Sequence, residues 1–447
     1  MTSSALLGRR LMALRLDRAR TGQLESAARP LTSRRADLAE LAAERARRLA
    51  VAVDGELIET GGGRYIRIEP SASDVPVDRA RLATLPSAPP PDVPLVCLDT
   101  ETTGLAPGPG TVAFLIGIGA WTGGRFRQVQ LLLPDQADEP ALLDALDALI
   151  PPDAWLVTYN GRSFDWPLLV ARYRMIGRAA PAHAGHLDLL PMVRRLFRHR
   201  LADARLRTVE TGLLRLDRGP DIDGWEIPGR YLACLRGEPA DPLVEVVRHN
   251  HEDVRSLARL LAHAEGSLGG AEDRRSAPTG DLVGLARAYR RIGRLEEALA
   301  CLEAALERPP PARTTPFSWT TALTTRADAL ESARSPHDAR DSRPALSLER
   351  ARLLRRLGRH DEALSAWRDM AAGGSPLAGL AWVEVAKSLE HRRRDHAAAL
   401  EACTAAARIA ERARWLGRPL VDIEADLTRR RRRLVGRMTG AGSGGAR

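Results

Sequence analysis

A short apolar stretch that ends in two acids constrains this chain most strongly. Leu95 to Leu98 follow Pro94 and form a run typical of a buried central strand. Asp99 and Glu101 come next, two residues apart. In a strand, residues with this spacing point to the same face and lie roughly 7 Å apart. Two carboxylates on one face repel each other and are costly to bury unpaired, so the pair favours a divalent metal such as Mg²⁺ or Mn²⁺.

By itself, the acid pair is also compatible with a strand that simply ends in a polar turn. The residues after it predict an α/β sheet, because apolar strands alternate with helices. Further strands are expected at 111–121, 128–133 and 154–159, and helices at 139–149 and 164–177. Ligand sites of such sheets lie at the carboxyl ends of strands, where Asp99, Glu101 and the turn at 160–165 all fall.

Composition changes along the chain divide it into seven expected segments. These are a basic helical region at 1–48, a β-hairpin at 49–70 with strands at 49–53 and 65–68, a Pro-rich linker at 71–91, the α/β domain at 92–266, a second linker at 267–280, helical repeats at 281–415 and a basic tail at 416–447.

The helical segment contains a repeated sequence pattern. Arg294–Leu299 matches Arg359–Leu364, and a looser copy follows at 395–400. Their equivalent alanines are 65 and 36 residues apart, about two periods and one period of the 34-residue tetratricopeptide repeat. Segment 281–415 therefore resembles tetratricopeptide repeats, with an eroded copy at about 311–345. A plain helical bundle is the alternative. Either arrangement would offer a surface for a protein partner.

Charge and hydropathy bear on the partners and the compartment. The net charge is +10, and segments 1–50 and 425–447 each carry +6. The basic ends could dock on nucleic acid, and the run Arg429–Arg433 is expected to be a flexible electrostatic anchor. The four cysteines form no CxxC pair, so neither a disulfide framework nor a zinc site is expected. We expect no membrane span and no signal peptide, and therefore a cytoplasmic protein.

Other polar motifs accompany the acid pair. Asp165 lies in Tyr-Asn-Gly-Arg-Ser-Phe-Asp, just after a predicted strand. His249 and Asp253 are four residues apart in a helical pattern, so they share one helix face. A His-Leu-Asp motif occupies 186–188. Several arginines between 194 and 207 surround Phe197, and we favour a solvated helix face with Phe197 in the core over a nucleic-acid contact.

In this order, the motifs D-x-E-T-T-G-L, Y-N-G-x-x-F-D, H-x-D and N-x-x-D resemble those of DEDD-type 3′–5′ exonucleases of the ribonuclease H-like superfamily. Segments 111–117 and 221–228 resemble the YprB-like branch of these proteins. The resemblance implies a ribonuclease H-like mixed sheet flanked by helices, followed by an all-α, tetratricopeptide-like domain. It covers roughly residues 49–265 well and the repeats loosely.

The resemblance also implies a site. Four carboxylates would bind two ions, Mg²⁺ or Mn²⁺, with Asp99 bridging them; these are Asp99, Glu101, Asp165 and Asp253. His249 stands where the superfamily has a Tyr general base, four residues before the last Asp, and would take that role. A solvent-facing or helix-packing His is the alternative. Substrate contacts are expected from Thr102, Asn160 and Phe164, whereas His186 and Asp188 are expected to be structural.

The sequence thus predicts a metal-dependent nuclease that hydrolyses phosphodiester bonds of single-stranded DNA or RNA from the 3′ end. Two metal ions would hold the attacking and leaving oxygens of the displacement. One alternative is a non-catalytic nucleic-acid-binding scaffold whose repeats recruit a protein partner. Another is a structure-selective endonuclease with the same metals.

Overall fold

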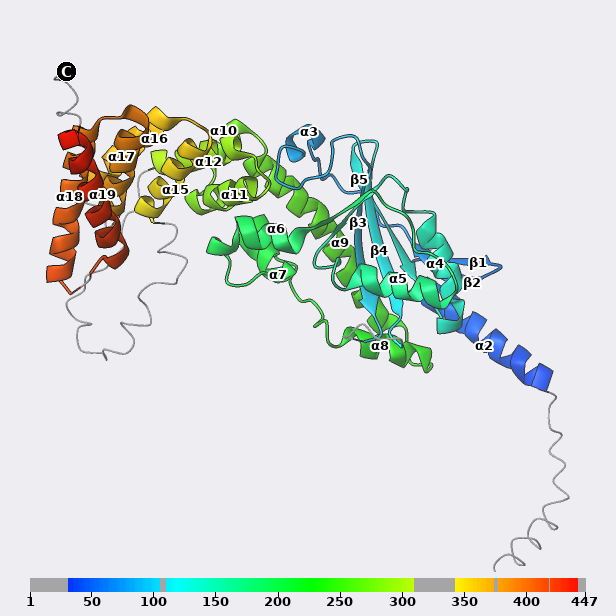
Figure 1. Ribbon diagram of the computed structural model, residues 1–447. Coiled ribbons are helices and arrows are strands. Elements are labelled where there is room, and N and C mark those ends of the chain that lie inside the picture. The colour runs from blue at the N-terminus through cyan, green and yellow to red at the C-terminus, as the bar shows by residue number, and fades with distance from the viewer. Residues whose placement is uncertain (1–30, 105–109, 309–341, 374–376, 418, 441–447) are drawn as a thin grey trace, which may run out of the picture.

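The computed structural model describes residues 31–104, 110–308, 342–373, 377–417 and 419–440. Its strands are β1 Glu56–Thr60, β2 Gly63–Ile68, β3 Leu95–Thr102, β4 Ala113–Thr122, β5 Arg125–Leu132, β6 Trp155–Thr158 and β7 Gly185–Asp188. They form one seven-stranded sheet that lies at one end of an elongated molecule (Figure 1).

Helices flank the sheet and then form the other end of the molecule (Figure 1). Those of the sheet region are α2 Leu31–Ala52, α3 Arg79–Leu82, α4 Glu139–Asp147, α5 Asp165–Met175, α6 Leu189–Leu196, α7 Leu206–Val209, α8 Ile227–Leu235 and α9 Asp241–Leu268. The C-terminal helices are α10 Ala271–Ser276, α11 Thr279–Arg291, α12 Leu295–Glu307, α15 Arg343–Arg356, α16 His360–Ala372, α17 Ala378–Ser388, α18 His396–Trp415 and α19 Val421–Gly440.

The sheet is mixed, as predicted. Its strand order is β1-β2-β5-β4-β3-β6-β7. The central strand β3 pairs antiparallel with β4 and parallel with β6, and β6 pairs parallel with β7. The carboxyl ends of β3, β6 and β7 therefore meet at one edge, where ligands of such sheets bind.

Side chains of β3 alternate between two apolar layers. Val96 and Leu98 belong to the layer that includes residues of α4, α5 and α8. Leu95 and Cys97 belong to the other layer, which includes residues of α6 and α9. This alternation is the period-two pattern of a strand covered on both faces.

The prediction that the hairpin begins with a strand at 49–53 was wrong. Residues 49–52 belong to α2, and the hairpin is formed by β1 and β2. Leu49, Ala50 and Val53 are buried, whereas Val51 is 83% exposed. A strand would have placed residues 49, 51 and 53 on one face, so the burial follows the helical spacing instead. β2 also pairs with β5, so the hairpin extends the main sheet.

The C-terminal helices form packed pairs, each against its neighbour along the chain (Figure 1). The alanines that mark the sequence repeat, Ala298, Ala363 and Ala399, are all buried. They lie near the beginning of α12, α16 and α18, the second helix of each pair. Most of the eroded copy expected at 311–345 lies outside the described residues.

The expectation of a flexible arginine anchor was wrong. Residues 429–433 lie within α19, which packs on α17 and α18. The reason is Glu390, which is 2% exposed and accepts hydrogen bonds from three arginines of this helix. Arg430 is itself buried, and Arg433 Nε lies 2.7 Å from Glu390 Oε1. A buried carboxylate needs such partners.

Glu390→Gln is expected to destabilise the helical region by about 3 kcal/mol at neutral pH, because it removes the buried carboxylate that pairs with Arg430 and leaves only Asp426, 3.4 Å away, as a counter-charge. Burial opposes the charge of Glu390, but hydrogen bonds from Arg433 and Arg430 outweigh it and lower the pKa of Glu390 to about 2. The pair therefore stabilises the fold above the ordinary pKa of 4.5 and loses this effect as the pH falls toward 2. Urea unfolding followed by circular dichroism across this pH range measures the difference, and an equal midpoint for both proteins at pH 7 would contradict the prediction.

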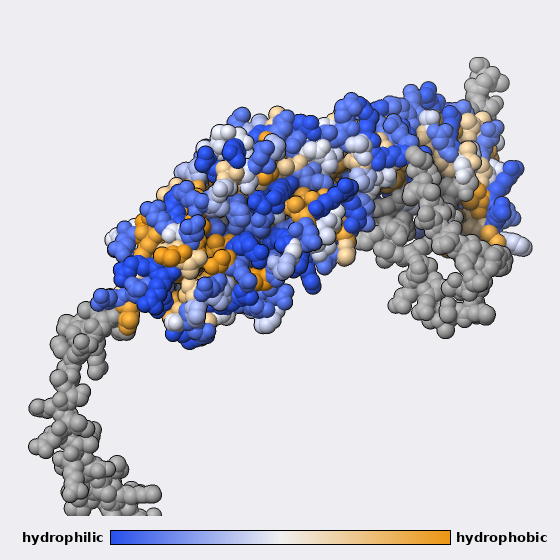
Figure 2. Space-filling model, turned by 180° about the vertical axis from the view of Figure 1, so that it is seen from behind, coloured by the Kyte–Doolittle hydropathy of each residue, from blue (hydrophilic) through white to orange (hydrophobic). Residues whose placement is uncertain are grey.

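The surface is mainly hydrophilic, with scattered hydrophobic patches on the face shown in Figure 2. No helix among the described residues is both long and apolar enough to cross a membrane. All four cysteines are buried and free.

Candidate functional site

The two acids of β3 lie on the face of the sheet that α9 covers. They continue the alternation of Leu95 and Cys97 at the carboxyl end of the strand. Asn250 of α9 is fully buried, and its Nδ2 donates a hydrogen bond to Asp99 Oδ2 at 2.9 Å. This contact holds α9, and with it Asp253, beside the strand.

A buried polar relay fixes the position of Asn250. Gln130 Nε2 on β5 donates to Asn250 Oδ1 and to the carbonyl oxygen of Val247, both at 2.8 Å. Gly117 on β4 provides the space, because a Cβ atom there would lie 2.3 Å from Asn250 Oδ1. Sequence reasoning missed this relay. The reason is that a glycine and a Gln on neighbouring strands form no recognisable sequence motif.

Asp165 reaches the same edge of the sheet from α5, of which it is the first residue. Its Oδ1 accepts hydrogen bonds from the Thr100 amide at 3.1 Å and the Thr100 hydroxyl at 2.5 Å. Thr100 lies between the two acids of β3. Asn160 begins the turn before α5 with a φ of 67°, a left-handed conformation that Asn tolerates better than most residues. At Gly161, a Cβ atom would lie 2.9 Å from Asp165 Oδ2.

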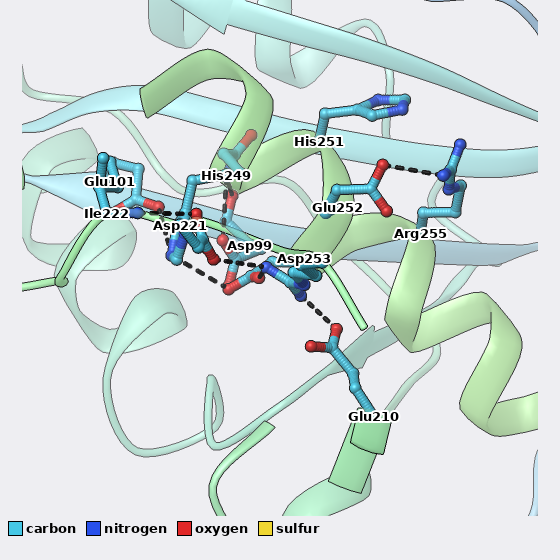
Figure 3. Close-up of polar contacts among 12 residues, drawn as sticks. Asp99, Glu101, Glu210, Asp221, Ile222, His249, His251, Glu252, Asp253 and Arg255 are labelled. Carbon is cyan, nitrogen blue, oxygen red and sulfur yellow. Dashed lines mark hydrogen bonds and ion pairs between the residues drawn. The ribbon is translucent and has the colours of Figure 1, made fainter. Parts of the chain in front are cut away.

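The His249 ring lies among carboxylates from separate segments of the chain (Figure 3). Its Nε2 lies 4.0 Å from Glu101 Oε1 and 3.8 Å from Asp253 Oδ2. Its Nδ1 lies 2.9 and 3.0 Å from the two carboxylate oxygens of Asp221. When Nδ1 carries the proton and donates to Asp221, Nε2 presents a lone pair toward the acids. The sequence pointed to segment 221–228 only through the family resemblance, and it did not predict the contact between Asp221 and His249.

Arg218 is a second residue that sequence reasoning missed. Its NH1 lies 2.5 Å from Asp253 Oδ1 and 3.5 Å from Asp221 Oδ2, and it also forms an ion pair with buried Glu210. Burial works against its charge, but Asp253 and Glu210 raise the pKa of Arg218 overall. It lies in an irregular segment before α8, so no periodic pattern pointed to it.

The site carries an excess of buried negative charge. Burial raises the pKa of the Asp99 carboxyl well above its usual range, and neighbouring carboxylates raise it further. These neighbours are Asp253, Asp165 and Glu101. The pKa of Glu101 is also raised, first by burial and then by Asp253 and Asp165. Like charges in close proximity add to the effect of burial, so the four acids form one electrostatic unit.

The donor set fits a hard divalent cation, which prefers carboxylate oxygens. Glu101 is 13% exposed, and no Arg or Lys side chain of the described residues forms an ion pair with it; His249 Nε2 lies 4.0 Å from its Oε1. Within the same residues, no group of three or more His, Cys, Asp or Glu side chains has the geometry of a formed metal site. One reason is that Asp253 already forms an ion pair with Arg218. Binding of a cation would require Asp253 to exchange that partner.

The other predicted site residues lie in the segments that carry these acids, at the end of β3 and in the turn before α5. Phe164 immediately precedes Asp165 and is 49% exposed. Thr102 at the end of β3 donates its hydroxyl to the carbonyl oxygen of Gly104 at 2.7 Å. The Asn160 amide donates to Asp188 Oδ1 at 2.8 Å, so Asp188 holds the turn. Phe197 is fully buried, as favoured above.

Comparison with known proteins agrees with this geometry. Residues 96–265 match a family model described as RNase_H superfamily. The chain is also similar to a protein of Bacillus subtilis (strain 168) named "Uncharacterized protein YprB", with 29% identity over 310 residues, which are 69% of this chain and 67% of that protein. The matched segment contains β4 to β7, nearly all of β3 and α9, and all four acids. Residues 96–265 therefore form an RNase H-like superfamily domain.

Proposed function

We propose that this chain is a metal-dependent 3′–5′ exonuclease that hydrolyses phosphodiester bonds of single-stranded nucleic acid. The observation that carries the proposal is the convergence of acids from β3, α5 and α9 at one edge of an RNase H-like sheet. Acids from separate segments are buried together at a cost that a bound cation would offset.

Asp99, Glu101, Asp165 and Asp253 would hold Mg²⁺ or Mn²⁺. Two such ions would supply a nucleophile from water near neutral pH and neutralise the leaving 3′ oxygen. Hydrogen bonds already orient two of these acids. Asn250 orients Asp99, and Thr100 orients Asp165.

His249 would act as the general base. Asp221 holds the ring through Nδ1 and leaves Nε2 directed at the acids, so a proton can move from the attacking water to Nε2. This dyad supports an enzyme over a non-catalytic scaffold, which would need no oriented imidazole among the metal-binding acids. Asp221 would stabilise the imidazolium that forms.

Phe164 would contact the terminal nucleotide. Its exposed ring lies beside Asp165, and a nucleobase can stack on such a ring. Thr102 and Asn160 would line the same end of the site. The helical pairs of the C-terminal region would be tetratricopeptide-like repeats that bind a protein partner.

Comparison of linear and circular single strands tests the exonuclease proposal. A circular strand has no 3′ end, so the enzyme is expected to degrade the linear strand and spare the circle. A phosphorothioate at the 3′ terminus should slow degradation, and the same group at the 5′ terminus should not. Cutting of the circle would favour the endonuclease alternative, and binding without cleavage of either strand would favour the scaffold.

A further inference from the structure

A pocket of about 410 Å³ lies between the RNase H-like domain and the first C-terminal helix pair. We call it the interdomain pocket. Its walls come from the loop after α3, the turn before α5, helix α6 and the end of helix α11. None of the residues discussed above as metal ligands lines it.

The walls of the interdomain pocket are fixed to one another. Gly284 of α11 packs so closely on α6 that a Cβ atom there would lie 2.4 Å from the Arg195 carbonyl oxygen. Tyr289 Oη donates to the carbonyl oxygen of Thr84 at 2.9 Å, and Arg294 NH1 donates to the same oxygen at 2.8 Å. The helical region therefore holds a defined position against the domain, and the pocket is preformed.

Three exposed arginines from three different elements line the pocket. Arg162 belongs to the turn before α5, Arg195 to α6 and Arg291 to α11. No ion pair with an acid is found for any of them among the described residues. Neighbouring arginines of the helical region do have acidic partners, because Arg290 forms an ion pair with Glu349 and Arg294 forms one with Glu297.

The single acid that lines the pocket does not balance this charge. Asp188 accepts hydrogen bonds from the amides of Asn160, Arg162 and Leu190, so its oxygens are occupied. The pocket thus contains arginines without acidic partners beside apolar side chains such as Met192 and Ile292. Ile292 is 47% exposed. Arginines that follow phosphates, beside apolar surface for sugars and bases, are the features of a single-strand binding groove.

The interdomain pocket adjoins the proposed catalytic site through one turn. Arg162 lies three residues before Asp165, and Asp188 fixes the turn from the pocket side. We propose that the pocket binds the phosphate backbone of the single-stranded polynucleotide next to its reacting end, so that α11 is part of the substrate-binding surface. This proposal rests on the proposed function and assigns a substrate contact to the C-terminal helices.

The charge-reversal variant Arg291→Glu tests the proposal in the full-length chain. Fluorescence anisotropy in EDTA separates binding from cleavage, with a labelled oligothymidylate of about 12 nucleotides and one of about 4 that is too short to span both sites. Arg291→Glu is expected to weaken binding of the longer strand about tenfold and to lower the slope of log affinity against log salt by about 0.7, the value for one phosphate contact. Binding of the shorter strand should not change.

The second repeat offers a matched control. Arg356 ends α15 as Arg291 ends α11, and each is exposed and followed by an apolar residue and a glycine. Arg356→Glu should bind both strands like the parent protein, and Arg195→Ala should weaken only the longer one. Equal affinities in Arg291→Glu and Arg356→Glu would overturn the proposal, as would a preference of the pocket for polyglutamate over the oligonucleotide. If Arg291→Glu weakens binding of the longer strand but the parent protein cleaves neither strand, the result would support the pocket as a polynucleotide-binding site and reject the exonuclease.

Discussion

His249→Ala is expected to lower the single-turnover cleavage rate by about 10²- to 10⁴-fold, the usual contribution of a positioned general base. The reason is geometric. Asp221 holds the ring through Nδ1, and Nε2 lies 3.8 Å from Asp253 Oδ2, where water bound beside the acids would be activated. Binding of a single-stranded oligonucleotide in EDTA should remain close to that of the parent protein, because His249 is assigned to the chemical step.

His251 provides the control for this variant. It lies on the same helix two residues later, and its side chain points away from the acids (Figure 3). His251→Ala should keep most of the cleavage rate. Asp221→Asn should lose less activity than His249→Ala, because the imidazole remains and only its orientation is weakened. Equal losses in His249→Ala and His251→Ala would indicate a general effect on α9 and would contradict a base at residue 249.

Asp99→Asn is expected to lower metal-dependent cleavage by at least about 10³-fold, because it removes the ligand proposed to bridge both ions. The same change should raise the melting temperature of the metal-free protein. Asp99 is buried among three other carboxylates, and an amide relieves their repulsion. The amide oxygen can still accept the hydrogen bond from Asn250. Differential scanning calorimetry in EDTA and a cleavage assay in Mn²⁺ measure the two effects.

Glu252→Gln is the matched control for Asp99→Asn. Glu252 lies next to Asp253 but forms ion pairs with Arg255 and Arg259 on another side of α9. It should retain cleavage and gain no thermal stability. An Asp99→Asn protein that is less stable than the parent and still active would show that Asp99 serves the fold and not a metal.

The sequence predicted the central strand well, because β3 is apolar on both faces and its two acids keep the strand period to the end. It also predicted the mixed sheet flanked by helices and the packed helix pairs that follow. The prediction of a hairpin strand at 49–53 was wrong for a physical reason. Ala and Val in a short run fit a helix face and a strand equally, and only tertiary burial of Leu49, Ala50 and Val53 decides between them.

Contacts between distant segments account for what the sequence did not predict at the site. Arg218 and Asp221 lie in an irregular segment, and their roles depend on how that segment passes beside α9. The Gln130–Asn250–Asp99 relay joins three elements that no local pattern connects. The five-arginine run 429–433 was misjudged similarly, since buried Glu390 lies about 40 residues earlier in the chain.

Degradation of a 5′-labelled single strand in Mn²⁺, Mg²⁺ or EDTA, beside an Asp99→Ala protein, tests the central claim most directly. Parallel DNA and RNA strands would also identify the preferred sugar. The account predicts a ladder that shortens from the 3′ end with either metal, and no ladder in EDTA or with Asp99→Ala. Retained nucleic-acid binding without cleavage in either metal would contradict it.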